Sequence, residues 1–473
     1  MTTFSTIQSI QEAWSVRKTG LQDTRRQTIE RRERAINLAL AKGIPNTRDE
    51  EWKYTSLRPL IDRQFDLIDG LRHDGGPVDG SLVARINARL AVNAIPIVFI
   101  NGRLDLSWPG SEALDSDYFR TLSEAELEED STFWDEWQST QGMDQLFAGI
   151  NAGLAHEGVV LVLNAEQFLK RPIHIIHLAT KDHPNAARIN RVVVSVPELA
   201  DVIVYEEFIS MDVLSLKPRV GEWTNSLTQF KLGPKAKCAY YRIVSSPNSF
   251  HTGSVTAVLD RDSQLDTFSL AIGSRFARIN IDVKFTAPGA ECTLDGLYLL
   301  QGEEHVDHHT TVDHTVGNCK TNQLYKGILA DKGRAVFNGK IYLRKDAQGS
   351  EAYQSNKNLL LSSEAEVDTK PQLEIDANDV KATHGAAIGS INPAELFYLR
   401  SRCIGEAEAT AMLCHGFAEE CVMKVKDDDA RALLRDRVRE WFKLFALTHS
   451  PSDPLTTKVI DLAARKILNE EKP

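Results

Sequence analysis

Hydrophobic positions recur with one period in the first part of the chain and with another in the middle. Ile7 to Trp14 and Arg25 to Lys42 carry apolar residues at helical spacing among many charged ones. Gly43-Ile44-Pro45 follows the second segment, and proline cannot continue a helical hydrogen-bond ladder. The pattern therefore predicts two amphipathic helices, the second of which ends at this tripeptide.

Shorter apolar runs follow, and they predict a mixture of strands and helices. Ile95 to Leu104 predicts a buried strand that ends in an Asn-Gly turn. Val159 to Leu163 and Ile173 to Leu178 predict two further strands. Ser123 to Trp137 is acidic, so we expect a solvated helix there, and Asp144 to His156 predicts an amphipathic helix.

From about Ile189 to Ile391, short β-rich segments alternate with turns, and no long helix is expected. The early turns are spaced by about 27 to 29 residues and the later ones by about 15 to 16. A regular strand–turn repeat favours a β-solenoid, in which each turn of chain buries its face against the next. A sandwich or a propeller would also contain many short strands. The turn signals lie around Ala236, Ser263, Ala290, Cys319, Arg334, Ser350, Ala365 and Val380.

The chain becomes helical again after Asn392-Pro393, where proline suits the first turn of a helix. We expect three regions: a helical region with a few strands over 1–160, a solenoid core over 161–391 and a helical domain over 392–473. The helices expected in the last region are Ala394 to Cys403, Glu406 to Met423, Ala430 to Leu447 and Pro454 to Leu468.

Composition narrows the class of protein. The 473 residues are 42% hydrophobic and 26% charged, with a formal net charge of -11, which argues against general nucleic-acid binding. No apolar run approaches the roughly 20 residues of a membrane helix. Met1 to Gln11 is polar and resembles no secretory signal. Six cysteines in a chain of this length fit a reducing compartment, so we expect a cytoplasmic protein.

The densest polar cluster is His305 to His314. On a strand, His305, Asp307 and His309 would share one face, and His308, Thr310, Val312 and His314 would share the other. Imidazole and carboxylate groups suit iron, zinc or manganese. Because the segment fixes no coordination geometry, we favour the alternative, in which these side chains form polar ladders along a solenoid.

The positions of the cysteines favour packing in the protein core over binding of a metal cluster. None forms a Cys-x-x-Cys pair or a ferredoxin-type cluster. Cys414 and Cys421 are expected to share a helix face and to pack in a core, and the three cysteines near solenoid turns are expected to point inward. The chain also lacks a phosphate-binding loop and a nucleophile elbow. The six are Cys238, Cys292, Cys319, Cys403, Cys414 and Cys421.

A lone histidine, His384, is followed by small residues from Gly385 to Gly389, which allow another backbone to approach closely. A neutral imidazole can bind a metal or carry a proton. Taken alone, the setting favours a structural histidine.

Three stretches together resemble the SufB/SufD family of the SUF iron–sulfur cluster assembly system. They are Pro45 to Leu57 (PNTRDEEWKYTSL), Asp307 to Leu329 (DHHTTVDHTVGNCKTNQLYKGIL) and the long run from Ser362 to Gly416. Phe147 to Leu161 and Arg171 to His177 are similar to the family's entry into the β-core. The resemblance implies a right-handed parallel β-helix flanked by helical regions.

The resemblance also implies a function. The chain would be a non-catalytic scaffold in an ATP-driven complex, paired with a SufB-like subunit through the β-helix edge. A SufC-like ATPase would dock on the C-terminal helices. No membrane and no nucleic acid is expected as a partner. It allows a homodimer when the chain is isolated, and reduced flavin as a further ligand.

By motif match, His384 is implied as a ligand of a nascent iron–sulfur cluster shared with the SufB-like partner. The Cys-Gly-Ala-His motif of SufB is absent, which favours the SufD branch of the family. Relatives often have cysteine where this chain has Ala382 and glycine where it has Cys403. The alternatives are a SufB-like scaffold or a β-helix carbohydrate-active enzyme, the second disfavoured by the helical C-terminal region and by the polar N-terminus.

Overall fold

The computed structural model places two helices at the start of the chain, α1 (Ile7–Thr19) and α2 (Arg26–Ala41), as the sequence predicts. The hairpin of β3 (Ile95–Ile100) and β4 (Arg103–Asp105) is also confirmed. Asn101 and Gly102 connect its strands at φ 51° and 86°, the left-handed values that a tight two-residue turn requires. The structure describes residues 2–3, 7–19, 21, 25–41, 43–67, 80–129, 131–138, 140, 142–143, 145–163, 171–180, 183, 185–210, 221–246 and 248–449.

The acidic segment that suggested one solvated helix folds as two short helices, so that prediction is wrong. They are α5 (Leu122–Glu128) and α6 (Ser131–Gln138). Trp134 and Trp137 of α6 are buried, and Glu126 of α5 forms buried ion pairs with two arginines of α2, at 2.9 and 2.8 Å. The acidic segment therefore packs against the N-terminal region through its buried tryptophans and the ion pairs of Glu126.

The helix that was expected to be amphipathic is α7 (Leu146–Leu154), and all nine of its residues are buried. It packs against α2, where Gly149 and Gly153 leave room for the side chains of Ala39 and Ile36. The remaining early elements are β1 (Thr2–Thr3), α3 (Arg58–Ile61), β2 (Gln64–Leu67), α4 (Gly80–Asn87) and β5 (Phe119–Thr121).

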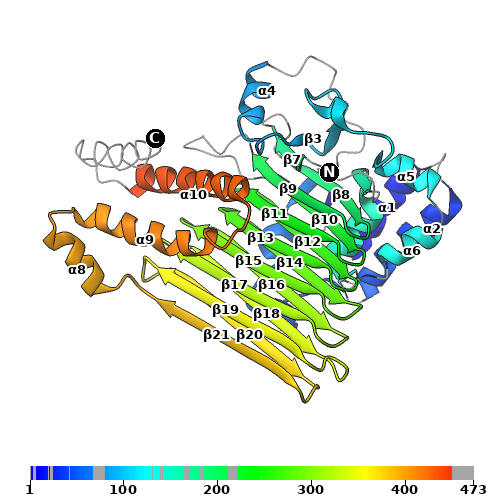
Figure 1. The fold of residues 1–473 in the computed structure, drawn as a ribbon. Coiled ribbons are helices and arrows are strands. Elements are labelled where there is room, and N and C mark those ends of the chain that lie inside the picture. Colours follow the sequence, from blue (N-terminus) through cyan, green and yellow to red (C-terminus); the bar gives the residue numbers. More distant parts are fainter. Residues whose placement is uncertain are drawn as a thin grey trace.

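A β-solenoid of about seven turns occupies residues 157–389 (Figure 1). Its strands lie in two parallel-stranded sheets, with even-numbered strands in one and odd-numbered strands in the other. The predicted parallel β-helix is confirmed, whereas its right-handed sense stays a prediction. The strands are β6 (Glu157–Val162), β7 (Ile173–Ala179), β8 (Ala186–Val196), β9 (Asp201–Ser210), β10 (Trp223–Leu232), β11 (Lys237–Ser245), β12 (Phe250–Leu259), β13 (Gln264–Ile272), β14 (Phe276–Phe285), β15 (Glu291–Leu300), β16 (His305–His314), β17 (Lys320–Leu329), β18 (Arg334–Leu343), β19 (Ser350–Leu360), β20 (Glu366–Ile375) and β21 (Val380–Gly389).

The change of period along the sequence has a simple structural cause. The turn signals at Ala236, Ser263 and Ala290 each precede a strand of the odd-numbered sheet, so they mark one corner in every complete turn. The later signals, such as Arg334 and Ser350, precede strands of alternate sheets and mark both corners. The geometry of the solenoid is therefore uniform, and only the visibility of its corners in the sequence changes.

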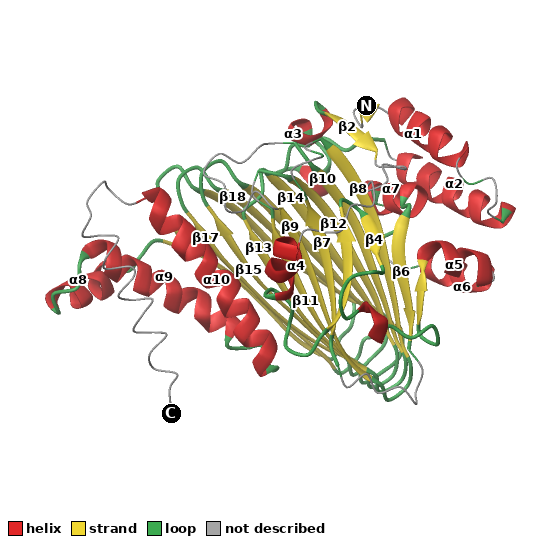
Figure 2. Cartoon of the chain, turned by 90° about the horizontal axis from the view of Figure 1, so that it is seen from above, coloured by secondary structure: helices red, strands yellow, loops and turns green. Residues whose placement is uncertain are grey.

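Helices cover the two sheets on opposite sides of the solenoid (Figures 1 and 2). The N-terminal helices pack on outward residues of the even-numbered sheet, including Trp223, Phe250 and Phe276. The helices α9 (Glu406–Val422) and α10 (Asp428–His449) pack on the odd-numbered sheet. A third C-terminal helix, α8 (Pro393–Ser401), has no buried residue. No helix of the described ranges is long and apolar enough to cross a membrane.

Asn392 begins α8 by accepting a hydrogen bond from the Ala394 amide at 3.0 Å, which explains why the helix starts at the predicted proline. The three C-terminal helices expected before residue 450 are confirmed. The last expected helix, Pro454 to Leu468, lies outside the described residues.

Candidate functional site

The two ends of the solenoid differ in how they are covered. At the first end, β3 extends the odd-numbered sheet beyond β7, and β5 and β6 extend the even-numbered sheet beyond β8. At the other end, β20 and β21 are the last strands of their sheets among the described residues, and they form one edge of the stack in Figure 1. We call these the closed end and the open end. No described strand pairs with the outer edge of β20 or β21, so each is an edge strand of its sheet.

His384 lies on β21 in a row of side chains that face the solenoid interior. It is in parallel register with Gln354 of β19, and Ala382 beside it packs against the central core. In earlier turns such inward positions are buried, but His384 is exposed because no further turn follows β21 in the described part of the chain. An imidazole on this row therefore faces whatever binds the open end.

The surroundings of His384 leave space for another chain. A Cβ atom built on Gly385 or Gly389 would meet no atom within 4 Å. Ile388 on the same strand is also exposed. Further along the chain, Phe397 and Tyr398 of α8 are 75% and 57% exposed. A bound partner would bury these exposed apolar side chains, as protein–protein interfaces do.

Beneath His384 the solenoid interior is polar. The amide nitrogen Nε2 of Gln354 donates to Gln323 Oε1 at 2.5 Å, and Gln323 Nε2 donates to Thr310 Oγ1 at 2.6 Å. Asn356 and Asn358, on the same face of β19, bond to each other and to the Tyr298 hydroxyl. These residues were not predicted from the sequence. A sequence signal for them exists, because β19 carries polar residues at alternate positions where earlier strands carry apolar residues.

A segment of the N-terminal region, Glu50 to Thr55, lies across the outer face of the even-numbered sheet, and we call it the strap. Thr55 Oγ1 donates to Asp307 Oδ2 at 2.5 Å, and Arg278 Nη1 donates to the same oxygen at 2.6 Å. Glu51 accepts from Lys340 at 3.0 Å, and Glu50 pairs with Lys370 of β20. The strap thus connects three successive strands to the open end.

These contacts explain the polar cluster from His305 to His314. His305, Asp307 and His309 face outward toward the strap, whereas His308, Val312 and His314 face the interior, as the alternation predicts. No group of three or more potential metal ligands occurs among the described residues. The outward side chains of the cluster make polar contacts with the strap and with Arg278 of the neighbouring strand, and a structural role as polar ladders stays a prediction.

The comparisons with known proteins decide the family. The model of the SUF system FeS cluster assembly SufBD core domain matches residues 177–417. The chain belongs to the SufBD family. It is 28% identical to the iron–sulfur cluster assembly protein SufD of Escherichia coli over 84% of this chain and 89% of that protein. A SufBD family protein of Synechocystis is 28% identical over 87% of this chain and 90% of that protein.

A SufBD family member from Mycobacterium leprae is 33% identical over a shorter stretch, 39% of this chain and 49% of that protein. Membership of a family of iron–sulfur cluster assembly proteins removes the support for a carbohydrate-active β-helix. The matched residues 177–417 include β21 and most of α9, so His384 lies inside the family core.

The thiols of this SufBD chain do not form a cluster site in the described residues. Cys238, Cys292 and Cys319 face the central core, and Cys414 and Cys421 pack between α9 and the solenoid, as predicted. Burial raises the pKa of the Cys414 and Cys421 thiols, so they stay protonated at neutral pH. Cys403 is exposed at φ 63°, a left-handed backbone conformation in which glycine is favoured.

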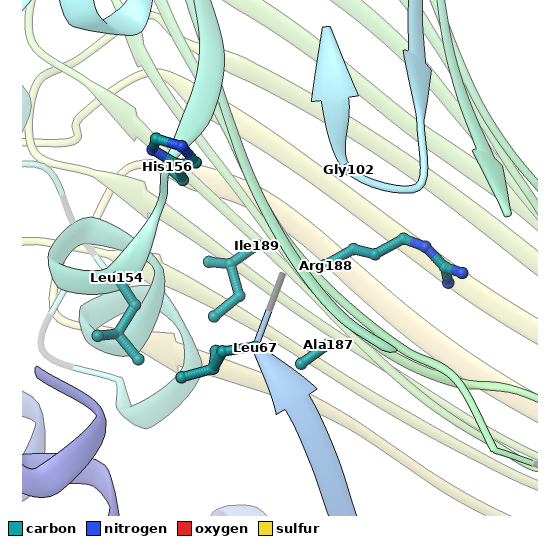
Figure 3. Close-up of a pocket in the computed structure, with 7 residues that line it drawn as sticks. All are labelled: Leu67, Gly102, Leu154, His156, Ala187, Arg188 and Ile189. Carbon is teal, nitrogen blue, oxygen red and sulfur yellow. The ribbon is translucent and has the colours of Figure 1, made fainter. Parts of the chain in front are cut away.

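A small cleft lies at the closed end, between β2, the end of α7 and β8 (Figure 3). It is lined by Leu67, Leu154, Ile189 and His156, while the guanidinium of Arg188 points away from it. His156 Nδ1 lies 2.5 Å from Arg17 Nη2, and burial with nearby arginines lowers the pKa of His156 to about 4. The reduced flavin that the family resemblance allows stays a prediction.

Proposed function

We propose that the chain is a cytoplasmic, non-catalytic SufD-like scaffold that presents His384 to a nascent iron–sulfur cluster at an interface with a SufB-like subunit. The observation that carries the proposal is that His384 is exposed on the inward row of β21, the last strand of its sheet among the described residues. Since the described residues offer no cluster of three ligands, the remaining ligands would come from the partner.

The open end supports edge-to-edge pairing with a similar solenoid. An exposed edge strand pairs readily with another strand, and the glycines beside His384 allow close backbone approach. A partner solenoid would extend both sheets at once and bury the row that contains His384. In the isolated chain, the same edges would pair two copies into a homodimer.

The C-terminal helices support a second contact, with a SufC-like ATPase. α8 buries none of its residues against the solenoid, and Phe397 and Tyr398 are exposed on it. In contrast, α9 is fixed to the odd-numbered sheet by Lys326, whose Nζ donates to Phe417 O at 2.9 Å and to Glu420 Oε2 at 2.6 Å. A movement of an ATPase bound to these helices would therefore be transmitted through α9 to β17, which lies two strands from β21 in the odd-numbered sheet.

The test is co-expression with the SufB-like and SufC-like proteins of the same organism, followed by size-exclusion chromatography and iron and sulfide analysis. We expect a stable complex, and we expect His384→Ala to leave it assembled with a lower cluster content. An unchanged cluster content in this variant would remove His384 from the proposal. Failure of the three chains to associate would reject the scaffold itself.

A further inference from the structure

We propose that Gln354 is a positioning residue for His384: its Oε1 accepts a hydrogen bond from one ring N–H of His384 and directs the other ring nitrogen toward the bound cluster. The inference rests on the proposed function, since it assumes that His384 is a ligand. It adds a residue that no family motif in the sequence analysis pointed to.

Two observations place Gln354 beside His384. The parallel register pairs the two residues on neighbouring strands, and both lie on the inward row. Gln354 is buried, and its Oε1 has no hydrogen-bond partner among the described residues. A buried acceptor without a donor costs free energy, so this oxygen favours any donor that the open end supplies. The next polar side chain on its row is His384.

The neighbouring amides fix which end of Gln354 remains available. Gln323 Nε2 donates to Thr310 Oγ1, which leaves Gln323 Oε1 as the acceptor for Gln354 Nε2. Gly339 keeps room for this amide, because a Cβ there would lie 2.1 Å from Gln354 Nε2. The chain of amides thus runs in one direction, and it ends on the oxygen of Gln354.

An acceptor at this point has a defined effect on an imidazole. A neutral histidine carries one N–H, and the partner of that N–H decides which nitrogen keeps its lone pair. In metal sites, such outer partners hold the ring orientation, and their loss typically lowers affinity by about 10- to 100-fold. In the free chain the His384 ring is exposed, so we expect the bond to form when the partner closes the open end.

The first experiment compares variants in the assembled complex, with iron retention titrated against a chelator. We expect Gln354→Met to weaken iron retention by about 10- to 100-fold. Gln354→Glu keeps an acceptor oxygen for His384 but loses the donor to Gln323 Oε1, so it is expected to retain iron better than Gln354→Met. Asn358→Leu removes a neighbouring buried amide on the same face and is the matched control for general loosening, with no loss expected.

The outcomes separate the two proposals. If His384→Ala lowers iron retention and Gln354→Met does not, the positioning role is rejected and the ligand role stands. If neither variant changes retention, the ligand role itself is rejected. If Gln354→Met and Asn358→Leu lower retention equally, the effect is loosening of the core and the positioning role is rejected.

A second measurement needs no variant that could fail to fold. In wild-type complex stripped of iron, with ¹⁵N-histidine in this chain alone, solid-state NMR reports the protonated ring nitrogen of His384, assigned with His384→Gln. We expect one neutral tautomer, with its N–H bonded to a side-chain carbonyl. A mixture of the two tautomers, as in free imidazole, would overturn the inference.

Discussion

The closed and open ends of the solenoid are made from the same repeating unit, yet their polar residues are satisfied differently. Inside the closed end, Glu206 accepts hydrogen bonds from Thr228 at 2.8 Å and from Arg242 at 3.0 Å, and it also contacts His177 and Tyr240. Inside the open end, the amide chain stops at the oxygen of Gln354, which has no donor among the described residues. The Glu206 carboxylate therefore has its partners within the chain, whereas the Gln354 oxygen is left for another group.

The outer faces repeat this contrast. On the closed end, Glu207 is buried between Arg437 of α10 and Arg89, at 2.8 and 2.6 Å, so distant parts of the chain meet there. On the open end, β21 is exposed along most of its length. We infer from this difference that the closed end contributes most of the stability of the fold, whereas the open end is available to bind a partner.

The largest effect is expected at the closed end. Glu207→Ala should lower the free energy of unfolding by about 3 to 5 kcal/mol, because it removes the buried carboxylate that pairs with the buried guanidinium of Arg437 and the partly buried one of Arg89. Urea unfolding of the full chain measures this loss. Glu364→Gln, in an exposed pair with Lys332 near the open end, is the control and should change stability by less than about 0.5 kcal/mol. Equal effects of the two substitutions would contradict the division.

Acid should weaken the closed end next. Burial alone would raise the pKa of Glu206, but the hydrogen bond with His177 and the charge of Arg242 lower it to about 2. Because this folded-state pKa lies below the unfolded value of about 4.3, the stabilisation is present above pH 4.3 and is lost as the pH falls toward 2. Between pH 5 and pH 2.5, Glu206→Gln should lose about 2 kcal/mol less than the wild type in urea unfolding. Parallel pH profiles would reject this role of Glu206.

An intermediate effect is expected where the C-terminal helices join the solenoid. Lys326 is fully buried and donates to Phe417 O and Glu420. Lys326→Met keeps most of the apolar stem but removes both bonds, so we expect a loss of about 1 to 2 kcal/mol. Hydrogen exchange of α9 should rise in this variant while exchange of β9 and β11 stays constant. If all strands exchange faster together, α9 is part of the same cooperative unit as the closed end.

Much of the fold could be predicted from the sequence because a solenoid repeats one local rule. Turn residues and alternating apolar positions recur, and together with the family motifs they indicated a parallel β-helix with helices on either side. The outward and inward faces of His305 to His314 followed from alternation alone. The prediction for Ser123 to Trp137 was wrong because the charge of a segment does not indicate which distant residues it will pair with. Glu126 is buried in ion pairs with Arg31 and Arg32 of α2.

The candidate site was only partly predictable for the same reason. His384 was found through its motif, but its place on an uncovered inward row depends on where the strands end and on their register. Gln354 belongs to no sequence motif. Its orientation depends on a hydrogen bond to Gln323, thirty-one residues earlier, and this bond exists only in the register of the folded chain. Contacts between turns of a solenoid are distant in sequence, so they escape a reading of local pattern.

The smallest effect on stability is expected at the open end, where Ile388 of β21 is exposed. Ile388→Lys should change the free energy of unfolding by less than about 0.5 kcal/mol, because no packed contact is lost. A charge on an edge strand opposes pairing, so the same variant should block association with the SufB-like partner and reduce any homodimer of the isolated chain. Sedimentation of the chain alone and of the co-expressed complex measures both effects, with Ile388→Val as the matched control that keeps the apolar edge. A loss of stability without a loss of association would show that β21 belongs to the packed core of the free chain, and the two ends would then be equivalent.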